Sequence, residues 1–278
     1  MIITADQVKE LRERTSAGLL DCKKALSEAG GDFEKAVEIL RKKGIASAAK
    51  REGREAKEGF IGIKTEKNKG VIVEVNCETD FVAKTEAFQA LVEKTVAQVF
   101  SEGEAVIQSS AFTSALVEVA AKTGEKLQAR RAATVKVDQG VVVSYLHSNR
   151  RVGVLVALET AAPSAEIEAA GREAAMQIAA MRPEYLDRTE IAPAWIAKEK
   201  EILLEQSKEA LQNKPEPVKE KILEGKLAKR FEEVCLLDQR YIKDDKQTVR
   251  QFLDAVAKKA GASLKIKRFV RYELGGSN

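Results

Sequence analysis

The sequence GVIVEVNCETDFVA, residues 70–83, joins an apolar strand directly to the start of a helix. Before it, GFIGIKTE from Gly59 alternates with a period of two, and a turn at Asn68, Lys69 and Gly70 joins the two segments. This pattern predicts a β-hairpin. A helix is predicted next, since its apolar positions follow a 3.6-residue period: Phe88, Leu91, Val92, Thr95, Val96 and Val99. A second helix is expected over 111–122. The chain is therefore expected to be α+β, with antiparallel strands.

The same design recurs further along the chain. GVVVSYL from Gly140, a turn at 147–151 and VGVLVALET predict a second hairpin, and Pro163 in a first turn begins an Ala-rich helix to about Met181. Comparison of GVIVEVNCET with GVLVALET leaves Asn76 and Cys77 as an extra pair in the first copy. The first copy then carries an Asp and a Phe that the second lacks. Two related α+β subdomains are predicted, and their difference points to function.

The segments outside the two repeated copies are predicted to be mainly helical. Residues 1–45 predict three short helices, opened by a capping box at Thr4 and Gln7 and closed by Gly44. A linker or a charged helix is expected over 46–58. From about 190 to 230, apolar pairs on charged helices interrupted by Pro215 and Pro217 predict a projecting helical hairpin whose apolar seam could dimerise. A closing strand, SLKIKRFVRYEL, is expected to join the second sheet. The expected domains are 1–54, 55–139, 140–182 with 228–278, and the hairpin 183–227.

Composition restricts the chemistry. The 278 residues are 44% hydrophobic and 32% charged with a net charge of +4, and no run is apolar enough for a membrane span or a leader, so a cytoplasmic protein is expected. His147 is the single histidine, and the three cysteines lie far apart, which disfavours a metal site or a disulfide framework. No GxxxxGK[ST] motif occurs. We therefore expect no cofactor, no bound metal and no direct nucleotide binding.

The candidate site is the stretch from Glu78 to Ala83. Either Thr79 or Asp80 can cap a helix there while Phe81 packs inward, or Asp80 caps the helix and Phe81 projects from the loop tip as a wedge. The GFIG sequence at 59–62 has the spacing of a nucleic-acid-clamping GxxG loop, but its central residues are apolar and a strand is favoured. His147 is expected in a turn.

Three function classes remain from the residues alone. The first is a binding protein that makes and breaks no covalent bond. The second is an RNA-binding accessory factor, motivated by the basic balance and the small N-terminal bundle. The third is a carboxylate enzyme using Glu78 and Asp80, which lie too close together for paired acid and base roles.

Several motifs, in order along nearly the whole chain, resemble the bacterial elongation factor Ts family. They are RERTSAGLLDCKKAL (12–26), GDFEKAVEILRKKG (31–44), EVNCETDFVA (74–83), RVGVLVALET (151–160) and LLDQRYIKDDKQTV (236–249). The resemblance implies an N-terminal ubiquitin-associated-like three-helix domain, two α+β core subdomains and a helical-hairpin, coiled-coil dimerisation module. The chain stops at ELGGSN, whereas some members of the family carry a further C-terminal helical module.

The resemblance also implies a function. The family comprises guanine-nucleotide exchange factors, not enzymes, that bind the translation GTPase elongation factor Tu in its GDP form. The segment Asp80, Phe81, Val82 and Ala83 would displace Mg²⁺ from the partner, so that GDP leaves and GTP can bind. Further partner contacts are implied at Thr79, Lys23, Gly124, His147, Tyr241 and Ile242. The hairpin would give a homodimer or a 2:2 heterotetramer.

Overall fold

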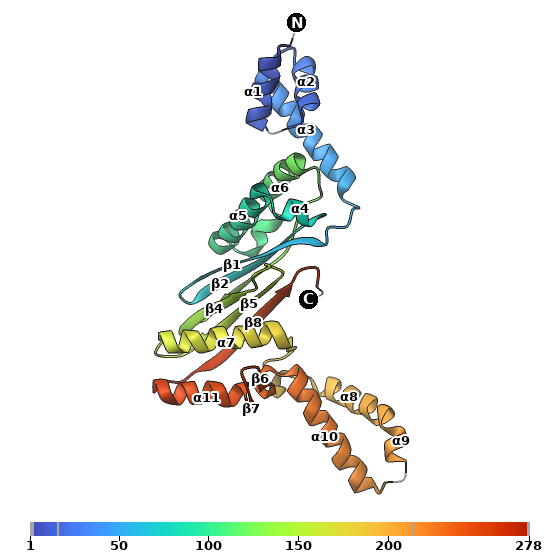
Figure 1. Cartoon of the computed structure of the whole chain (residues 1–278), viewed down its shortest axis with the longest axis vertical. Helices are drawn as coiled ribbons and strands as arrows, with labels where there is room; N and C mark the ends of the chain where they lie inside the picture. Colours follow the sequence, from blue (N-terminus) through green and yellow to red (C-terminus); the bar gives the residue numbers. More distant parts are fainter. Residues whose placement is uncertain (1–2, 16, 213, 277–278) are drawn as a thin grey trace.

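The computed structural model describes residues 3–15, 17–212 and 214–276. The molecule is elongated, with a three-helix domain at one end, a layered body in the middle and a helical hairpin at the other end (Figure 1). Helices and small antiparallel sheets make up the body, so the predicted α+β class is confirmed.

The N-terminal domain consists of α1 (Ala5–Thr15), α2 (Leu19–Glu28) and α3 (Phe33–Arg51). The predicted capping box is present: the amide of Gln7 donates to Thr4 Oγ1 at 3.3 Å, and the amide of Thr4 donates to Gln7 Oε1 at 3.0 Å. The small core of the domain comprises Val8, Leu11, Cys22, Ala25, Leu26 and Ala36. The prediction that Gly44 ends the third helix is wrong. The helix continues through Gly44 to Arg51, because Gly44 faces Val117 and Ala121 of the helix Ser110–Thr123 (α6) and the packing of these two helices outweighs the low helix propensity of glycine.

The first copy of the repeat is a three-stranded antiparallel sheet covered by two helices. Its strands are β1 (Glu58–Glu66), β2 (Lys69–Cys77) and β3 (Gln128–Lys136), in the order β1-β2-β3. Its helices are α5 (Glu86–Glu102) and α6 (Ser110–Thr123), joined through the 3₁₀ segment η1 (Glu104–Gln108). The GFIG sequence lies inside β1, as favoured. The hairpin turn is one step earlier than expected, because Lys67 takes a left-handed φ of 51° and Lys69 already pairs with Glu66.

The second copy repeats this order. Its strands are β4 (Gly140–Leu146), β5 (Val152–Glu159) and β8 (Lys265–Glu273), in the order β4-β5-β8, so the closing strand joins the second sheet as predicted. Its helices are α7 (Ala165–Met181) and α11 (Val249–Ala260). Pro163 precedes the first turn of α7 instead of lying in it, since Ser164 accepts a hydrogen bond from the amide of Ile167 and caps the helix.

The sheet register corrects the predicted alignment of the two copies. Gly59 pairs with Asn76, and Gly140 pairs with Glu159; both glycines have a positive φ at the start of a strand. A bulge follows Glu74 in β2 and Ala157 in β5. Asn76 therefore corresponds to Glu159, and the extra residues of the first copy lie after the strand, not within it.

The two sheets pack face to face and the helices cover their outer faces (Figure 1). The layer between the sheets contains Ile61, Ile72, Val135, Val137, Val142, Leu155, Ala157 and Tyr272. Two further clusters fill the spaces beneath α5 and beneath α7 with α11. Because both copies contribute side chains to the core between the sheets, they form one body. Its four layers are helices, sheet, sheet and helices.

One charged side chain is fully buried in this body. Glu74 accepts hydrogen bonds from Arg131 Nε at 2.6 Å, from Arg130 at 3.1 Å and from the amide of Gly275 at 2.8 Å. Burial by itself would raise the pKa of Glu74, but these donors and Asn76 together lower it. The carboxylate thus ties β2 to β3 and to the segment after β8.

A helical hairpin is inserted between α7 and α11. Its helices are α8 (Pro193–Gln206), the short α9 (Lys208–Leu211) and α10 (Glu216–Val234), after the 3₁₀ turn η2 (Arg188–Glu190). The 3₁₀ turn η3 (Leu236–Asp238) and the small strand pair β6 (Arg240–Tyr241) and β7 (Asp244–Thr248) return the chain to α11. The expected boundary at 227 falls within α10, which continues to Val234.

The cysteines and the apolar character of the helices bear on two further sequence expectations, on a disulfide framework and on a membrane span. Cys22, Cys77 and Cys235 are free and buried. Within the described residues, we find no helix that combines the length and apolar character needed to cross a bilayer.

Candidate functional site

The short helix α4 (Asp80–Ala83) is the local feature that distinguishes the first copy. Residues 78–84 link β2 to Thr85, the N-cap of α5, whereas only 161–163 link the corresponding position to Ser164, the N-cap of α7. The first connection is longer by the four residues of α4. These extra residues form the candidate site.

The helix α4 begins at a capped residue. Thr79 has extended backbone angles, and its side-chain oxygen accepts a hydrogen bond from the amide of Val82 at 3.3 Å. Thr79 is therefore the cap that the sequence left open between two residues. Asp80 instead forms an ion pair with Lys84 at 2.6 Å, and this hydrogen bond lowers the pKa of Asp80.

Phe81 and Ala83 lie on opposite sides of α4. Ala83 is buried in the cluster beneath α5, and Val82 packs against the same cluster. Phe81 is 79% exposed, the highest value among the large hydrophobic side chains of the described residues. The expectation that Phe81 packs inward is thus wrong. The projection of Phe81 into solvent is confirmed, although Thr79 and not Asp80 caps the helix.

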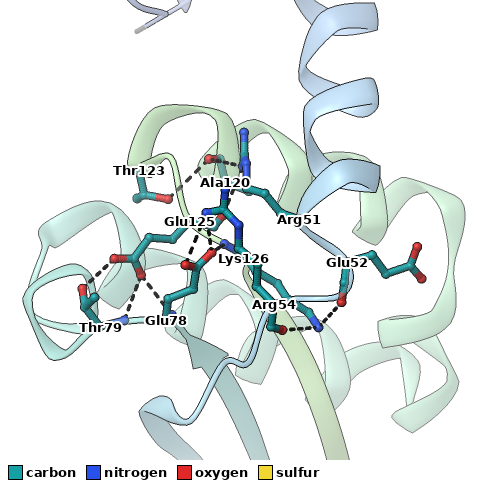
Figure 2. A network of polar contacts seen from close by, with 9 residues as sticks. All are labelled: Arg51, Glu52, Arg54, Glu78, Thr79, Ala120, Thr123, Glu125 and Lys126. Carbon is teal, nitrogen blue, oxygen red and sulfur yellow. Dashed lines mark hydrogen bonds and ion pairs between the residues drawn. The ribbon is translucent and has the colours of Figure 1, made fainter.

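A carboxylate from a distant loop holds the residues that lead into α4. Glu125 Oε2 accepts hydrogen bonds from the amides of Glu78 and Thr79, each at 3.0 Å, and Oε1 accepts from the hydroxyl of Thr79 at 2.6 Å (Figure 2). The hydroxyl of Thr79 thus donates to Glu125 while it accepts from Val82. We call this set of bonds the Glu125 clamp.

Glu78 makes the reciprocal bond to the same loop. Its carboxylate accepts from the amide of Lys126 at 2.6 Å and forms an ion pair with Arg54 at 3.2 Å (Figure 2). The bond from the Lys126 amide is the main reason that the pKa of Glu78 is lowered, followed by the interaction with Arg54. The Glu78 carboxylate therefore stays ionised at neutral pH and joins the residues before α4 to the loop at Lys126 and to the linker at Arg54.

The end of α3 is tied to this loop as well. Arg51 donates to the carbonyl oxygens of Ala120 at 3.0 Å and Glu125 at 3.2 Å, and Lys126 Nζ donates to those of Glu52 at 2.6 Å and Arg54 at 2.9 Å (Figure 2). The linker from the N-terminal domain, the 124–126 loop and the start of α4 therefore form one polar network.

Of the predicted contact residues, Gly124 belongs to the loop of this network, and His147 lies in a turn that reaches β1. Gly124 caps the C-terminus of α6 with a left-handed φ of 75°, which suits glycine, and so directs Glu125 toward Thr79. His147 lies in the β4–β5 turn, beside Tyr145, as expected for a turn residue. This turn reaches β1 through a hydrogen bond from the amide of Ile61 to the carbonyl of Arg150 at 2.8 Å, and α4 contacts the same strand.

The structure does not bring Lys23, Tyr241 and Ile242 to α4. Lys23 is exposed on α2. Tyr241 is buried in the second copy, where it stacks on Phe252 at 4.4 Å and donates to Glu173 at 3.0 Å; burial, followed by this bond, raises the pKa of Tyr241 to about 12. Its neighbour Ile242 is 44% exposed. Of this pair, only Ile242 offers a large accessible side chain.

Sequence reasoning missed the residues that hold the site in place. Glu125 lies 46 positions beyond Thr79, and the bonds of Arg51 cross 69 positions or more. No local period or motif marks such pairs. A signal that could have pointed to this loop is Gly124, because a glycine that follows a predicted helix, here 111–122, is typical of a C-cap and a turn.

The arrangement around α4 is typical of a protein that binds another protein. Aromatic side chains are enriched at protein–protein interfaces, and Phe81 is an exposed one on a short helix that the Glu125 clamp anchors. Among the described residues, we find no group of three or more metal-ligating side chains.

Comparison with known proteins identifies the family of this chain. Residues 78–276 match the family described as Elongation factor TS. The chain is 45% identical to elongation factor Ts of Clostridium botulinum (strain Alaska E43 / Type E3), over 99% of this chain and 93% of that protein. It is 42% identical to that of Rhodospirillum centenum, over 98% and 93% of the two chains, and 46% identical to that of Nitrobacter hamburgensis, over 98% and 92%. The chain belongs to the elongation factor Ts family of translation elongation factors.

Proposed function

We propose that this protein is the guanine-nucleotide exchange factor of the GTPase elongation factor Tu. It binds the GDP form of the GTPase in the cytoplasm and inserts Phe81 between helices of that partner. The elements that hold the partner's Mg²⁺ shift, the ion leaves, and GDP follows so that GTP can bind. The observation that carries this proposal is the 79% exposed Phe81 on a helix whose opposite side is buried.

The physical basis is a negative coupling between two ligands of the GTPase. In such GTPases, Mg²⁺ bridges the phosphates, so displacement of its ligands weakens nucleotide binding. By linkage, GDP must weaken binding of the exchange factor by the same factor. No covalent bond is made or broken by this chain, and the nucleotide is bound by the partner alone.

Phe81 cannot supply all of the binding energy. Burial of one Phe side chain is worth roughly 1.5 to 3 kcal/mol, or about one to two powers of ten in an equilibrium constant. Asp80, Val82 and Ala83 complete the inserted segment. We assign further partner contacts to Thr79, Lys23, Gly124, His147, Tyr241 and Ile242.

The inserted hairpin is proposed as a contact between two chains, giving a homodimer or a 2:2 heterotetramer. Large apolar side chains on α8 and α10 support this, since Leu204 is 49% and Val218 43% exposed. Sedimentation of the wild-type chain mixed with elongation factor Tu tests this proposal, because it measures the mass of the complex.

The exchange proposal is tested by stopped-flow release of a fluorescent GDP analogue from elongation factor Tu. The wild-type chain, Phe81→Ala and the control Met181→Ala are compared; Met181 is also an exposed apolar residue, but lies at the end of α7. We expect the wild type to accelerate release by orders of magnitude. Phe81→Ala should lose about tenfold to a hundredfold of that acceleration, and the control should lose none.

Other results would contradict the proposal. A wild-type chain that leaves GDP release unchanged removes the exchange function and favours RNA binding, which would fall steeply with salt. A Phe81→Ala variant as active as the wild type keeps the function and removes the wedge.

A further inference from the structure

A single carboxylate accepts the hydrogen bonds of the two backbone amides that lead into α4. Glu125 accepts three hydrogen bonds from two consecutive residues, and no other side chain bonds to the amides of Glu78 and Thr79 in the described part of the chain. The third hydrogen bond comes from the same hydroxyl that caps α4. The direction of the first turn of α4 is therefore linked to the position of one side chain.

Backbone contacts at residues 124–126 hold Glu125 in position. Its carbonyl oxygen accepts from Arg51 at 3.2 Å, and the left-handed Gly124 precedes it. Lys126, which follows it, donates its amide to Glu78. The carboxylate is thus aimed at Thr79 before any partner binds.

The second copy lacks such a clamp. There the amide of Thr160 donates to the backbone carbonyl of Gln139 at 3.2 Å, and the amide of Ala162 donates to the hydroxyl of Thr160 at 3.3 Å. Backbone and local bonds are sufficient for the short connection 161–163. The clamp therefore accompanies α4 and is not part of the shared frame.

We infer that Glu125 is a positioning residue for nucleotide exchange, which holds α4 so that Phe81 points outward, ready to insert. This inference rests on the proposed function and adds a residue to it. A wedge held in place before binding loses little conformational freedom when it inserts, so more of its burial energy remains to shift the partner.

The two oxygens of the Glu125 carboxylate match the donors that they face. A carboxylate has two acceptor oxygens, which matches the two amides and the hydroxyl. The amide of Gln keeps one acceptor oxygen for the two backbone donors and turns an NH₂ toward Thr79, whose oxygen can accept it. Ala offers neither. Loss of function should therefore be graded from Gln to Ala.

The test compares Glu125→Ala, Glu125→Gln and the control Glu118→Ala. Glu118 is exposed on α6 and carries the same charge. Two readouts are used on the full chain: GDP release from elongation factor Tu, and hydrogen exchange of the amides of residues 78–85. The activity of Glu125→Ala is also measured in the Phe81→Ala background.

We expect Glu125→Ala to lose about tenfold of the exchange rate and Glu125→Gln less than about threefold, with faster hydrogen exchange at residues 78 and 79 in the Ala variant. Glu118→Ala should match the wild type in both readouts. In the Phe81→Ala background, Glu125→Ala should add little, because both changes remove the same action.

Three results would overturn the inference. They are full exchange activity in Glu125→Ala, unchanged protection of residues 78 and 79, or a full additional loss in the Phe81→Ala background. A wild-type chain without exchange activity would instead remove the proposed function and, with it, the role of Glu125 in exchange. The hydrogen-exchange readout would still report whether the clamp exists, so the two failures are distinguishable.

Discussion

The two copies in the body share a frame and differ in what is inserted into it. Each begins at a positive-φ glycine, pairs its first two strands in a hairpin, continues with two helices and returns with a third strand beside the second. The first copy carries α4 between strand and helix, whereas the second carries the helical hairpin between its two helices. The segments to which we assign a function are therefore additions at connections, while the sheets and their covering helices stay alike.

The difference extends to charge. Glu74 in β2 is fully buried in an ionic network, and the corresponding residue in β5 is the apolar Ala157, which is also fully buried. The first copy uses the carboxylate to hold β3 and the segment after β8. One copy thus stabilises the other through its C-terminal end.

Removal of Glu74 should have the largest effect on stability. Glu74→Ala leaves Arg131, only 10% exposed at its side chain, and the amide of Gly275 without this acceptor, and we expect a loss of about 3 to 5 kcal/mol in the free energy of unfolding. Urea denaturation measures it. Glu66→Ala, an exposed carboxylate at the end of β1, is the control and should change stability by less than about 0.5 kcal/mol. Equal effects of the two changes would show that the network is dispensable.

The paired glycines test whether the two frames are equivalent. A Cβ at Gly59 would lie 2.1 Å from the carbonyl oxygen of Val75, and a Cβ at Gly140 would lie 1.9 Å from that of Leu158. We expect Gly59→Ala and Gly140→Ala each to destabilise by about 2 to 4 kcal/mol, again measured by urea denaturation. Gly225→Ala in α10, where a Cβ meets nothing within 4 Å, should be neutral or stabilising. A large effect in only one copy would contradict the equivalence.

The smallest stability effect is expected for exchanging the connections. Replacement of residues 78–84 by the sequence of 161–163 removes α4 and leaves both sheets paired, so the loss should be about 1 to 2 kcal/mol, mainly from burial of Ala83 and Val82. Exchange activity should be lost entirely. The reverse outcome, an unfolded protein, would show α4 to be part of the core and not an addition to it.

The sequence predicted the elements whose signal is local. Alternation, the turn residues and the helical period were sufficient for both hairpins, for α5 and for the three-helix domain. The prediction went wrong where a distant contact overrides a local signal, as at Gly44, which continues α3 beside α6. The alignment of the repeats failed because Glu and Thr recur in both copies, whereas register is set by the glycine pairs and the bulges.

The candidate site was predicted in part. Phe81 was correctly given a projecting alternative, but the cap expected with it was wrong: Thr79 caps α4, and Asp80 pairs with Lys84. The Glu125 clamp and the packing of sheet on sheet were not predictable, because both depend on contacts between residues far apart in the chain.

The base of the inserted hairpin has a consequence for how this chain can vary in length. The amides of Glu184 and Tyr185 both donate to the carbonyl of Val234, and Tyr185 forms a parallel bridge with Cys235, so the two ends of the insertion meet. Once these ends are joined, the entropy of closing the loop grows only slowly with the number of residues beyond them. Evolution can therefore lengthen, shorten or replace the hairpin at this junction with little penalty to the sheets.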